Sequence, residues 1–200
     1  MKANRWDDHL TRQARDEKWL ARSVYKLQEI DNKYKLIGKG DRLLDLGCYP
    51  GSWSQYGIKK VGLEGDVVGI DLTRPNRLSY PNFRFLEHDI LTLDIEWLSR
   101  EVGPRDVVVS DLAPQTTGIR GTDAIRSVSL ARRALDIALV LLKKKGNFVC
   151  KVFEGEDLEA FRSEISTHFR NTQTFRPRAT RKRSREIYLV GLTKVAMRRI

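Results

Sequence analysis

The sequence contains little cysteine and little histidine, and these shortages exclude several architectures. Cys48 and Cys150 are its two cysteines, too few for a small scaffold held together by disulfides. With cysteine this sparse, a reducing compartment is the default, and we expect a cytoplasmic protein. The three histidines are scattered, and none has a cysteine or another histidine at the spacing of metal ligands. We therefore expect no metal site.

Long hydrophobic runs are also missing. No apolar stretch approaches the roughly 18 to 20 residues that cross a bilayer, and the charged N-terminus MKANRWDDHLTRQARDEKW does not resemble a secretory signal. Internal repeats and low-complexity linkers are absent as well. At 200 residues the chain has the size of one domain. We expect a monomeric single domain over 1–200, with a basic helical segment over 1–34, a core over 40–194 and no membrane association.

Acidic residues are outnumbered by basic ones. The chain has 37 Lys and Arg against 26 Asp and Glu, a net charge of +11. The excess is concentrated near the two ends, in residues 2–26 and in RPRATRKRSR at 176–185. Either cluster alone is compatible with a solvated helix face or loop. Two clusters folded onto one face would instead attract a polyanion such as RNA, DNA or an anionic membrane.

What the sequence does contain is an alternation of strand and helix patterns. Short apolar runs alternate with segments whose apolar residues recur at helical spacing. In the clearest helix, 122–146, the lysines 143–145 would face the negative end of the helix dipole and Gly146 would end the helix. The alternation predicts an α/β fold, a mostly parallel sheet with helices on both faces. The expected strands are 42–47, 66–72, 83–90, 106–114, 147–153 and 186–194, and the other expected helices are 18–34, 53–61 and 157–169.

Chemically distinctive residues follow the predicted strands. The loop DLGCYPGSW at 45–53 has glycines for a sharp turn near a ligand, yet it matches neither G-x-G-x-x-G nor a phosphate loop. Asp71 comes 20 positions after Gly51, a spacing that suits hydrogen bonds to both ribose hydroxyls. Asp89 and Asp111 end the next two strands. Any one acid can be a cap or turn residue, but acids at three successive strand ends predict a nucleoside site. Because the loop lacks the phosphate-binding motifs, we expect a nucleoside without pyrophosphate, of which S-adenosylmethionine (SAM) is the common one.

Five segments carry a more specific pattern: ARSVYKLQEID, DLGCYPGSWSQ, SDLAP, KVFEG and SREIYLV, in this order. They resemble the R-S-R-A-x-[YF]-K-L-x-E-I, DLGAAPGGWSQ, S-D-[ML]-A-P, K-V-F-x-G and S-R-E-x-Y motifs of the FtsJ-type (RlmE-class) ribosomal RNA 2′-O-methyltransferases. The resemblance extends from about residue 15 to residue 193. It implies a Rossmann-like SAM-dependent methyltransferase fold, with a seven-stranded sheet that ends in an antiparallel hairpin.

The resemblance also implies a reaction and its residues. The reaction is methyl transfer from SAM to the 2′-hydroxyl of a ribose, a uridine's, in the RNA of the large ribosomal subunit. The implied catalytic tetrad is Lys26, Asp111, Lys151 and Glu186. The implied SAM contacts are Gly51, Trp53, Asp71, Asp89 and Asp111.

The chemistry calls for a base. A ribose 2′-hydroxyl is a weak acid, so in-line displacement by its oxygen needs a proton acceptor within hydrogen-bond reach. We expect Lys151 to be this base, with the positive charge of Lys26 favouring its neutral form. Asp111 and Glu186 would orient the ammonium groups and the ribose, although carboxylates also favour the charged form of a lysine.

RNA contacts are expected from the basic clusters, since lysine and arginine neutralise phosphates. The expected contacts are Arg22, Arg181, Lys182, Arg183 and Arg185. The sequence departs from the family at Cys48-Tyr49, usually two alanines, and at Ser52, usually glycine. Tyr49, the larger change, would face either the methionine end of SAM or the RNA.

Two other functions fit the same residues. Relatives of this fold methylate transfer RNA or messenger RNA caps, and a non-catalytic ribosome-assembly factor could keep the fold. The short length favours the ribosomal enzyme. The complete tetrad speaks against an inactive relative.

Overall fold

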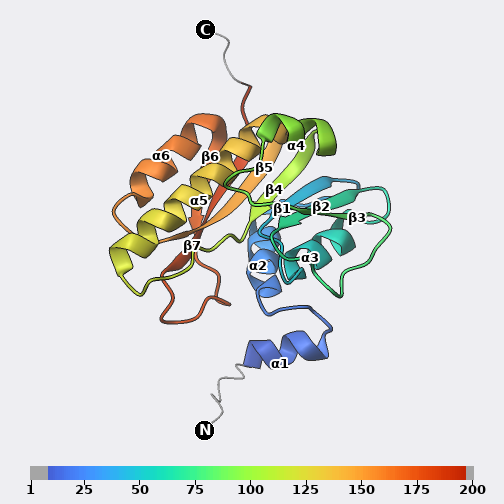
Figure 1. Cartoon of the computed structure of the whole chain (residues 1–200), viewed down its shortest axis with the longest axis horizontal. Coiled ribbons are helices and arrows are strands. Elements are labelled where there is room, and N and C mark those ends of the chain that lie inside the picture. The colour runs from blue at the N-terminus through green and yellow to red at the C-terminus, as the bar shows by residue number, and fades with distance from the viewer. Residues whose placement is uncertain (1–8, 197–200) are drawn as a thin grey trace.

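The computed structural model describes residues 9–196 as one sheet covered by helices (Figure 1). In chain order the elements are α1 (His9–Asp16), α2 (Val24–Tyr34), β1 (Arg42–Leu46), α3 (Ser52–Val61), β2 (Asp66–Asp71), β3 (Phe83–Glu87), α4 (Ile95–Val102), β4 (Arg105–Ser110), α5 (Arg120–Leu141), β5 (Leu142–Phe153), α6 (Leu158–His168), β6 (Phe169–Phe175) and β7 (Glu186–Lys194).

The seven strands form a single sheet in the order β3-β2-β1-β4-β5-β7-β6. β3, β2, β1, β4 and β5 are parallel neighbours. β7 runs antiparallel to both β5 and β6. The predicted α/β class, with a mostly parallel seven-stranded sheet and a closing antiparallel hairpin, is confirmed.

Helices cover both faces of this sheet (Figure 1). α4, α5 and α6 pack on one face, while α2 and α3 pack on the other. Between them, β1 is buried at every position except its first, and β4 at every position except its second. Strands covered on both sides need apolar side chains on both sides, which is why these segments appear in the sequence as continuous apolar runs.

The long helix ends earlier than its pattern predicts. α5 ends at Leu141 and β5 begins at the next residue, so the basic run 143–145 lies in a strand. The prediction that these lysines face the helix dipole and that Gly146 ends the helix is wrong. A Cβ at Gly146 would lie 2.9 Å from the backbone oxygen of Asp106 on β4. The glycine therefore serves the close approach of two strands.

The helix predicted over 18–34 is shorter as well, because α2 starts at Val24. The segment before it is held by Gln55 of α3. The Gln55 side-chain nitrogen donates to the Lys18 carbonyl at 2.9 Å, and its oxygen accepts from the Leu20 backbone N–H at 3.0 Å. α1 lies within the basic segment 1–34 that is predicted to be helical, whereas α4 and β6 correspond to none of the predicted helix and strand ranges.

The carboxyl ends of the parallel strands, the start of β7 and the start of α2 lie together at one edge of the sheet. The carboxyl ends of the parallel strands meet there, where ligands of open α/β sheets bind. Because β7 runs in the opposite direction, its first residue, Glu186, lies at the same edge, paired in register with Phe153 at the end of β5. The start of α2 reaches this edge through the Trp53 side chain of α3, which donates to the Ser23 carbonyl at 2.8 Å.

Candidate active site

A cavity of about 450 Å³ opens at this edge and is lined by Asp71, Asp89 and Asp111. These acids lie at the carboxyl ends of β2, β3 and β4, as the sequence predicts: Asp71 is the last residue of β2, and the other two follow their strands. Within residues 9–196, its lining includes no lysine or arginine. We call it the acidic cavity. The remaining lining residues are largely apolar, with Leu72, Ile90 and Leu91 beside the acids.

The loop after β1 shapes one wall of the acidic cavity. Gly47 has a φ of 77°, and a Cβ there would lie 2.7 Å from the side chain of Leu112, so glycine lets the two loops approach closely. The Tyr49 backbone N–H donates to Asp71 Oδ2 at 2.9 Å, and the Thr73 N–H donates to Asp71 Oδ1 at 3.1 Å. The Asp71 carboxylate is thereby held in place. The half-exposed Tyr49 ring lies in the cavity wall.

Two of the residues expected to contact SAM lie outside this lining. Trp53 is buried, with its ring centroid 5.7 Å from that of Tyr188 and its indole N–H donated to Ser23. Gly51, at a φ of 109°, starts α3, and a Cβ there would lie 2.9 Å from the Leu20 side chain. In this structure both residues join α3 to the segment before α2 instead of facing the acidic cavity.

The four residues of the implied tetrad come together as two ion pairs. Lys151 Nζ lies 3.0 Å from Asp111 Oδ1, and it also donates to the Asp111 backbone carbonyl. Lys26 Nζ lies 2.6 Å from Glu186 Oε1. All four side chains are less than one-fifth exposed. Segments more than a hundred residues apart in sequence thus meet at one point.

Tyr188 connects the two ion pairs, a role that the motifs alone do not reveal. Its hydroxyl lies 2.8 Å from Asp111 Oδ1 and 3.0 Å from Glu186 Oε1. A phenol has one proton to donate, so the two carboxylates share it. The contact follows from register, since Tyr188 pairs with Lys151 across β7 and β5. The only sequence signal was the tyrosine of SREIYLV.

The electrostatics of these contacts set the charge states of two of the residues, Asp111 and Tyr188. Burial raises the pKa of Asp111, but the charges of Lys151 and Lys26 and hydrogen bonds from Lys151 and Tyr188 outweigh it, so the pKa lies below its ordinary value. Burial and the two neighbouring carboxylates raise the pKa of Tyr188 well above its ordinary value. Asp111 is therefore ionised and Tyr188 is a neutral donor at pH 7.

A fourth carboxylate, Asp45 of β1, is buried and interacts electrostatically with Asp111 and Asp71 of the acidic cavity. Burial raises its pKa to about 7, a hydrogen bond from Ser54 opposes the rise, and the charges of Asp111 and Asp71 add to it. Asp45 Oδ1 has no hydrogen-bond partner within residues 9–196. Burial, together with the charges of the two nearby carboxylates, therefore favours the protonated form of Asp45.

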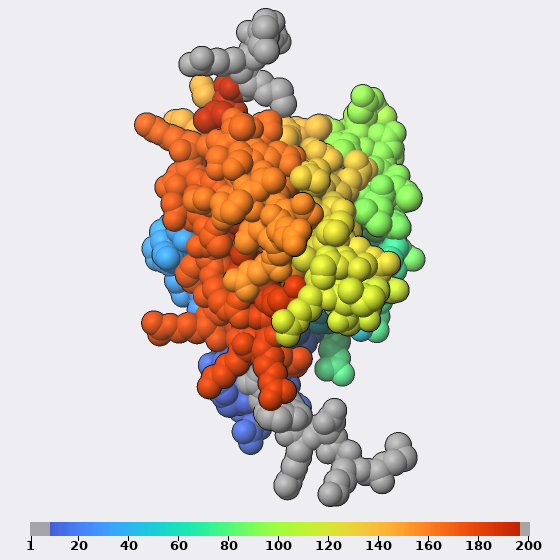
Figure 2. All heavy atoms as spheres, turned by 90° about the vertical axis from the view of Figure 1, so that its left-hand side faces the viewer, coloured from blue at the N-terminus to red at the C-terminus, as the bar shows by residue number. Residues whose placement is uncertain are grey.

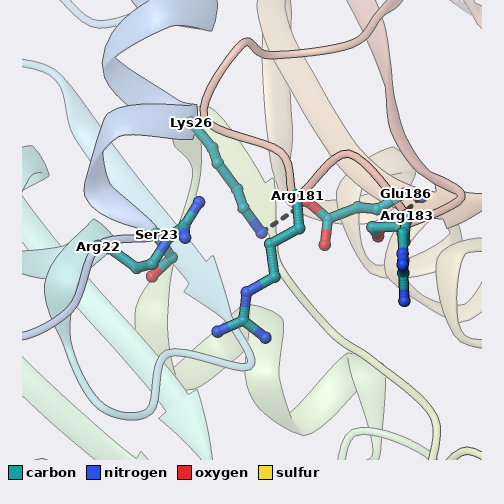
Figure 3. Close-up of a pocket in the computed structure, with 7 residues that line it drawn as sticks. Arg22, Ser23, Lys26, Arg181, Arg183 and Glu186 are labelled. Carbon is teal, nitrogen blue, oxygen red and sulfur yellow. Dashed lines mark hydrogen bonds and ion pairs between the residues drawn. The ribbon is translucent and has the colours of Figure 1, made fainter. Parts of the chain in front are cut away.

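A second cavity, of about 410 Å³, lies beside the Lys26–Glu186 pair (Figure 3). Its lining includes Arg22 from the segment just before α2, Lys26 from the first turn of α2, and Arg181 and Arg183 from the loop before β7. We call it the basic cavity. Ser23, Ser184 and Glu186 complete its lining. Figure 2 shows the orange-red segment before β7 next to the blue N-terminal residues, and the Arg22 guanidinium donates to the Ala179 carbonyl across this junction.

The basic cavity therefore unites the two basic clusters, although not all of their members. Lys182 and Arg185 are absent from its lining. The Arg185 guanidinium instead donates to the Glu154 and Arg120 carbonyls at 3.3 and 3.1 Å. The first basic residues of the N-terminal cluster, Lys2 and Arg5, lie outside the described residues.

Other sites are not apparent in residues 9–196. No helix there is long and apolar enough to span a membrane. No group of three His, Cys, Asp or Glu side chains in the same part of the chain is arranged to hold a metal ion. Cys48 and Cys150 are both buried, and burial raises the pKa of both thiols, so neither is poised as a nucleophile.

Comparison with known proteins places this geometry in context. Residues 19–194 match the family model described as FtsJ-like methyltransferase. A Desulfosudis oleivorans protein named ribosomal RNA large subunit methyltransferase E is 46% identical, over 96% of this chain and 93% of its own. A Bdellovibrio bacteriovorus protein of the same name is 47% identical, over 94% and 96%. A crystal structure described as a ribosomal RNA methyltransferase from Plasmodium falciparum has a TM-score of 0.77 at 26% identity, covering 89% of this chain and all of that one.

Proposed function

Because the chain belongs to the FtsJ-like methyltransferase family, we propose that it transfers a methyl group from SAM to a ribose 2′-hydroxyl in large-subunit ribosomal RNA. The observation that supports this most strongly is the chain of contacts from Lys26 through Glu186, Tyr188 and Asp111 to Lys151. This chain joins a cavity of carboxylates to a cavity of cations. A positively charged methyl donor and a negatively charged RNA acceptor would meet at the centre of these contacts.

The acidic cavity fits SAM by the chemistry of its lining. Carboxylates such as Asp71 accept hydrogen bonds from vicinal ribose hydroxyls, and Asp89 can accept from an adenine amino group. The apolar side chains of Leu72, Ile90 and Leu91 provide surface for a purine ring. When bound, SAM supplies a methyl group already activated by its sulfonium, so that transfer to an RNA oxygen is an in-line displacement.

In this proposal Lys151 is the general base. Its amine, in the neutral form, accepts the proton of the 2′-hydroxyl as the oxygen becomes a nucleophile. The ionised Asp111, 3.0 Å away, stabilises the ammonium that forms and fixes its position. The side chain is nearly buried, which limits competition from water for the same proton.

Lys26 and Glu186 have a positioning role in the same proposal. Their 2.6 Å ion pair forms part of the lining of the basic cavity. Tyr188 ties Glu186 to Asp111, so the two pairs keep a fixed separation. A substrate ribose placed against Lys26 is thereby aligned with Lys151. Fixed alignment of reacting groups is a major part of the rate gain in transfers of this kind.

The basic cavity is the proposed RNA site. Arg22, Arg181 and Arg183 line it, and Lys182 and Arg185 of the same loop add positive charge nearby. Lysine and arginine neutralise phosphates, and a 2′-hydroxyl target is found in RNA and not in DNA. The large subunit as substrate follows from the names of the relatives, and a uridine as target from the family resemblance. Such particles place the reaction in the cytoplasm.

A methyl-transfer assay with competing substrates tests this proposal. The protein is incubated with tritium-labelled SAM and with large ribosomal subunits from cells that lack the endogenous modification, free transfer RNA or capped messenger RNA. We expect label in large-subunit RNA, and primer extension would then locate the position. Label in transfer RNA or caps alone would overturn the substrate, and no label in any RNA would favour a non-catalytic assembly role.

A further inference from the structure

Tyr49 is a large aromatic side chain that stands open in the acidic cavity. Of the six tyrosines in the sequence, Tyr49 and Tyr80 are the two that are exposed, at 52% and 41%. Tyr49 belongs to the lining of the acidic cavity, whereas the lining within residues 9–196 does not include Tyr80. A phenol ring in water forgoes the stabilisation that burial gives. A ligand that fills the cavity would supply this burial.

The backbone of Tyr49 fixes the place from which its ring extends. The Tyr49 N–H donates to Asp71 Oδ2 at 2.9 Å, and the side chain branches from the adjoining Cα. Asp71 is the carboxylate proposed to accept hydrogen bonds from the ribose hydroxyls of SAM. The ring therefore starts beside the proposed ribose position and forms part of the wall next to it.

Other side chains of the same cavity are left open in the same way. Leu72 and Leu91 line the acidic cavity and are among the most exposed large hydrophobic side chains of the described chain. Concave sites that combine apolar and aromatic side chains with a few polar groups are typical of small-molecule binding. The ring of Tyr49 and these two leucines thus form apolar surface around the three carboxylates.

The charge of the lining selects which ligand of the proposed reaction can reach this ring. The acidic cavity contains three carboxylates, and its lining within residues 9–196 has no lysine or arginine. An RNA phosphate would meet like charge there, while the sulfonium of SAM is a cation. The face of an aromatic ring also attracts cations. SAM, and not RNA, is therefore the ligand that suits this wall.

We propose that the Tyr49 ring packs against bound SAM, next to the ribose held by Asp71, and contributes to its affinity. This assignment rests on the proposed function, because it takes SAM as the methyl donor. The motif that this loop resembles has alanine at the position of Tyr49. The contact is therefore a feature of this sequence and not of the motif.

Chemical protection of the two exposed tyrosines tests the contact without an activity assay. The full-length protein is treated with tetranitromethane, which nitrates accessible tyrosine rings, and the nitrated peptides are quantified by mass spectrometry. Saturating SAM should slow the nitration of Tyr49 several-fold and leave that of Tyr80 unchanged. A short single-stranded RNA added without SAM should not protect Tyr49.

Three variants measure what the ring contributes to affinity. Tyr49→Ala should raise the Kd for SAM about tenfold in calorimetric titrations, as for the loss of partial burial of an aromatic ring. Tyr49→Phe keeps the ring and should bind SAM nearly as tightly as the wild-type protein. Tyr80→Ala is the matched control at the other exposed tyrosine and should retain the wild-type Kd. Thermal midpoints measured in parallel show whether each variant is folded.

The outcomes separate this assignment from the proposed function. If SAM binds the wild-type protein without protecting Tyr49, or binds folded Tyr49→Ala as tightly as the wild type, the contact is overturned while SAM binding stands. Protection of Tyr49 by RNA alone would also overturn it, since the ring would then face the RNA. If the wild-type protein does not bind SAM, the proposed function itself has failed.

Discussion

The acidic cavity and the basic cavity share one edge of the sheet but are built in different ways. The carboxylates of the acidic cavity lie at the carboxyl ends of the parallel strands β2, β3 and β4, so the topology of the sheet places them at one edge. The cations of the basic cavity come from the start of α2 and from the loop before β7, more than 150 residues apart. Strand ends hold their side chains rigidly, whereas the basic cavity depends on a junction between two loops. The difference suits a small ligand of constant shape on one side and a large polymer on the other.

The tetrad connects the two cavities, because its residues belong to the linings of both. Asp111 belongs to the lining of the acidic cavity, and Lys26 and Glu186 belong to that of the basic cavity. Each cavity therefore contributes one carboxylate to a shared ion-pair chain, and Tyr188 joins the halves. Changes in one cavity should affect one ligand, while changes in the chain should affect the reaction itself.

The largest effect is expected at Lys151. Lys151→Met keeps the length of the side chain and removes the nitrogen, and we expect kcat to fall by about 100-fold or more because the base is lost. Binding of SAM, measured by calorimetry, should stay nearly unchanged. The variant will also be less stable, because Asp111 loses its ion-pair partner.

Lys194→Met controls for that loss of stability. Lys194 is a partly buried lysine at the far end of β7, where its ammonium donates to the Leu139 and Leu142 carbonyls. The same substitution there should lower the thermal midpoint and leave kcat unaltered. Equal kcat losses in the two variants would argue against a base at Lys151.

A smaller effect, confined to one cavity, is expected at Asp89. Asp89→Asn removes a charged acceptor from the acidic cavity, and we expect the Kd for SAM to rise about tenfold, as for the loss of one hydrogen bond to a charged group. RNA affinity in a filter-binding assay should not change. Glu87→Gln, an exposed carboxylate at the end of β3, serves as the matched control. Weaker RNA binding by Asp89→Asn would break the separation of the two cavities.

The reverse pattern is expected in the basic cavity. Arg183→Gln should weaken binding to large-subunit RNA several-fold and reduce the slope of log Kd against log salt by about 0.7 to 0.9, the contribution of one neutralised phosphate. SAM affinity should be unaffected. Arg178→Gln carries the same charge change outside the cavity lining. An identical slope for the wild-type protein and Arg183→Gln would remove this residue from the RNA site.

The smallest effect concerns the free energy of unfolding, which the burial of Asp45 near other carboxylates makes dependent on pH. Since the pKa of Asp45 is raised from its ordinary 3.8 to about 7, folding favours its protonated form. That stability is fully present below about pH 4 and is lost as the pH rises through 7, with a slope of at most about 1.4 kcal/mol per pH unit. Asp45→Asn should flatten this part of the profile and raise the free energy of unfolding at pH 8. Urea titrations between pH 5 and 8 measure it, and an unaltered pH profile would contradict the assignment.

Much of the fold and part of the site could be predicted from the sequence. Continuous apolar strands and the acids at their ends are local features. Parallel strands bring their carboxyl ends to one edge of the sheet, so the sequence predicts that Asp71, Asp89 and Asp111 lie there, and the cavity lining confirms it. The motif positions Lys26 and Glu186 also meet, at 2.6 Å. In both cases a local pattern carries the information.

Features that depend on register or packing could not be predicted in this way. The run 143–145 resembles a helix end, but Leu142 already pairs with Arg105 of β4, and this tertiary pairing overrides the helical pattern. Trp53 belongs to the motif that is expected to bind SAM, yet only the packing of α3 shows that its ring lies against Tyr188. Tyr188 joins the two ion pairs of the tetrad through its register with Lys151, which no single segment reveals.

The chemical position of the transferred methyl group tests the central claim most directly. Large-subunit RNA labelled from tritiated SAM is hydrolysed in alkali, which cleaves each RNA linkage through its free 2′-hydroxyl. A 2′-O-methyl group blocks that cleavage, so the account predicts that the label is recovered in one alkali-resistant dinucleotide. Recovery of the label in mononucleotides would show methylation of a base and would contradict a tetrad built to activate a ribose hydroxyl.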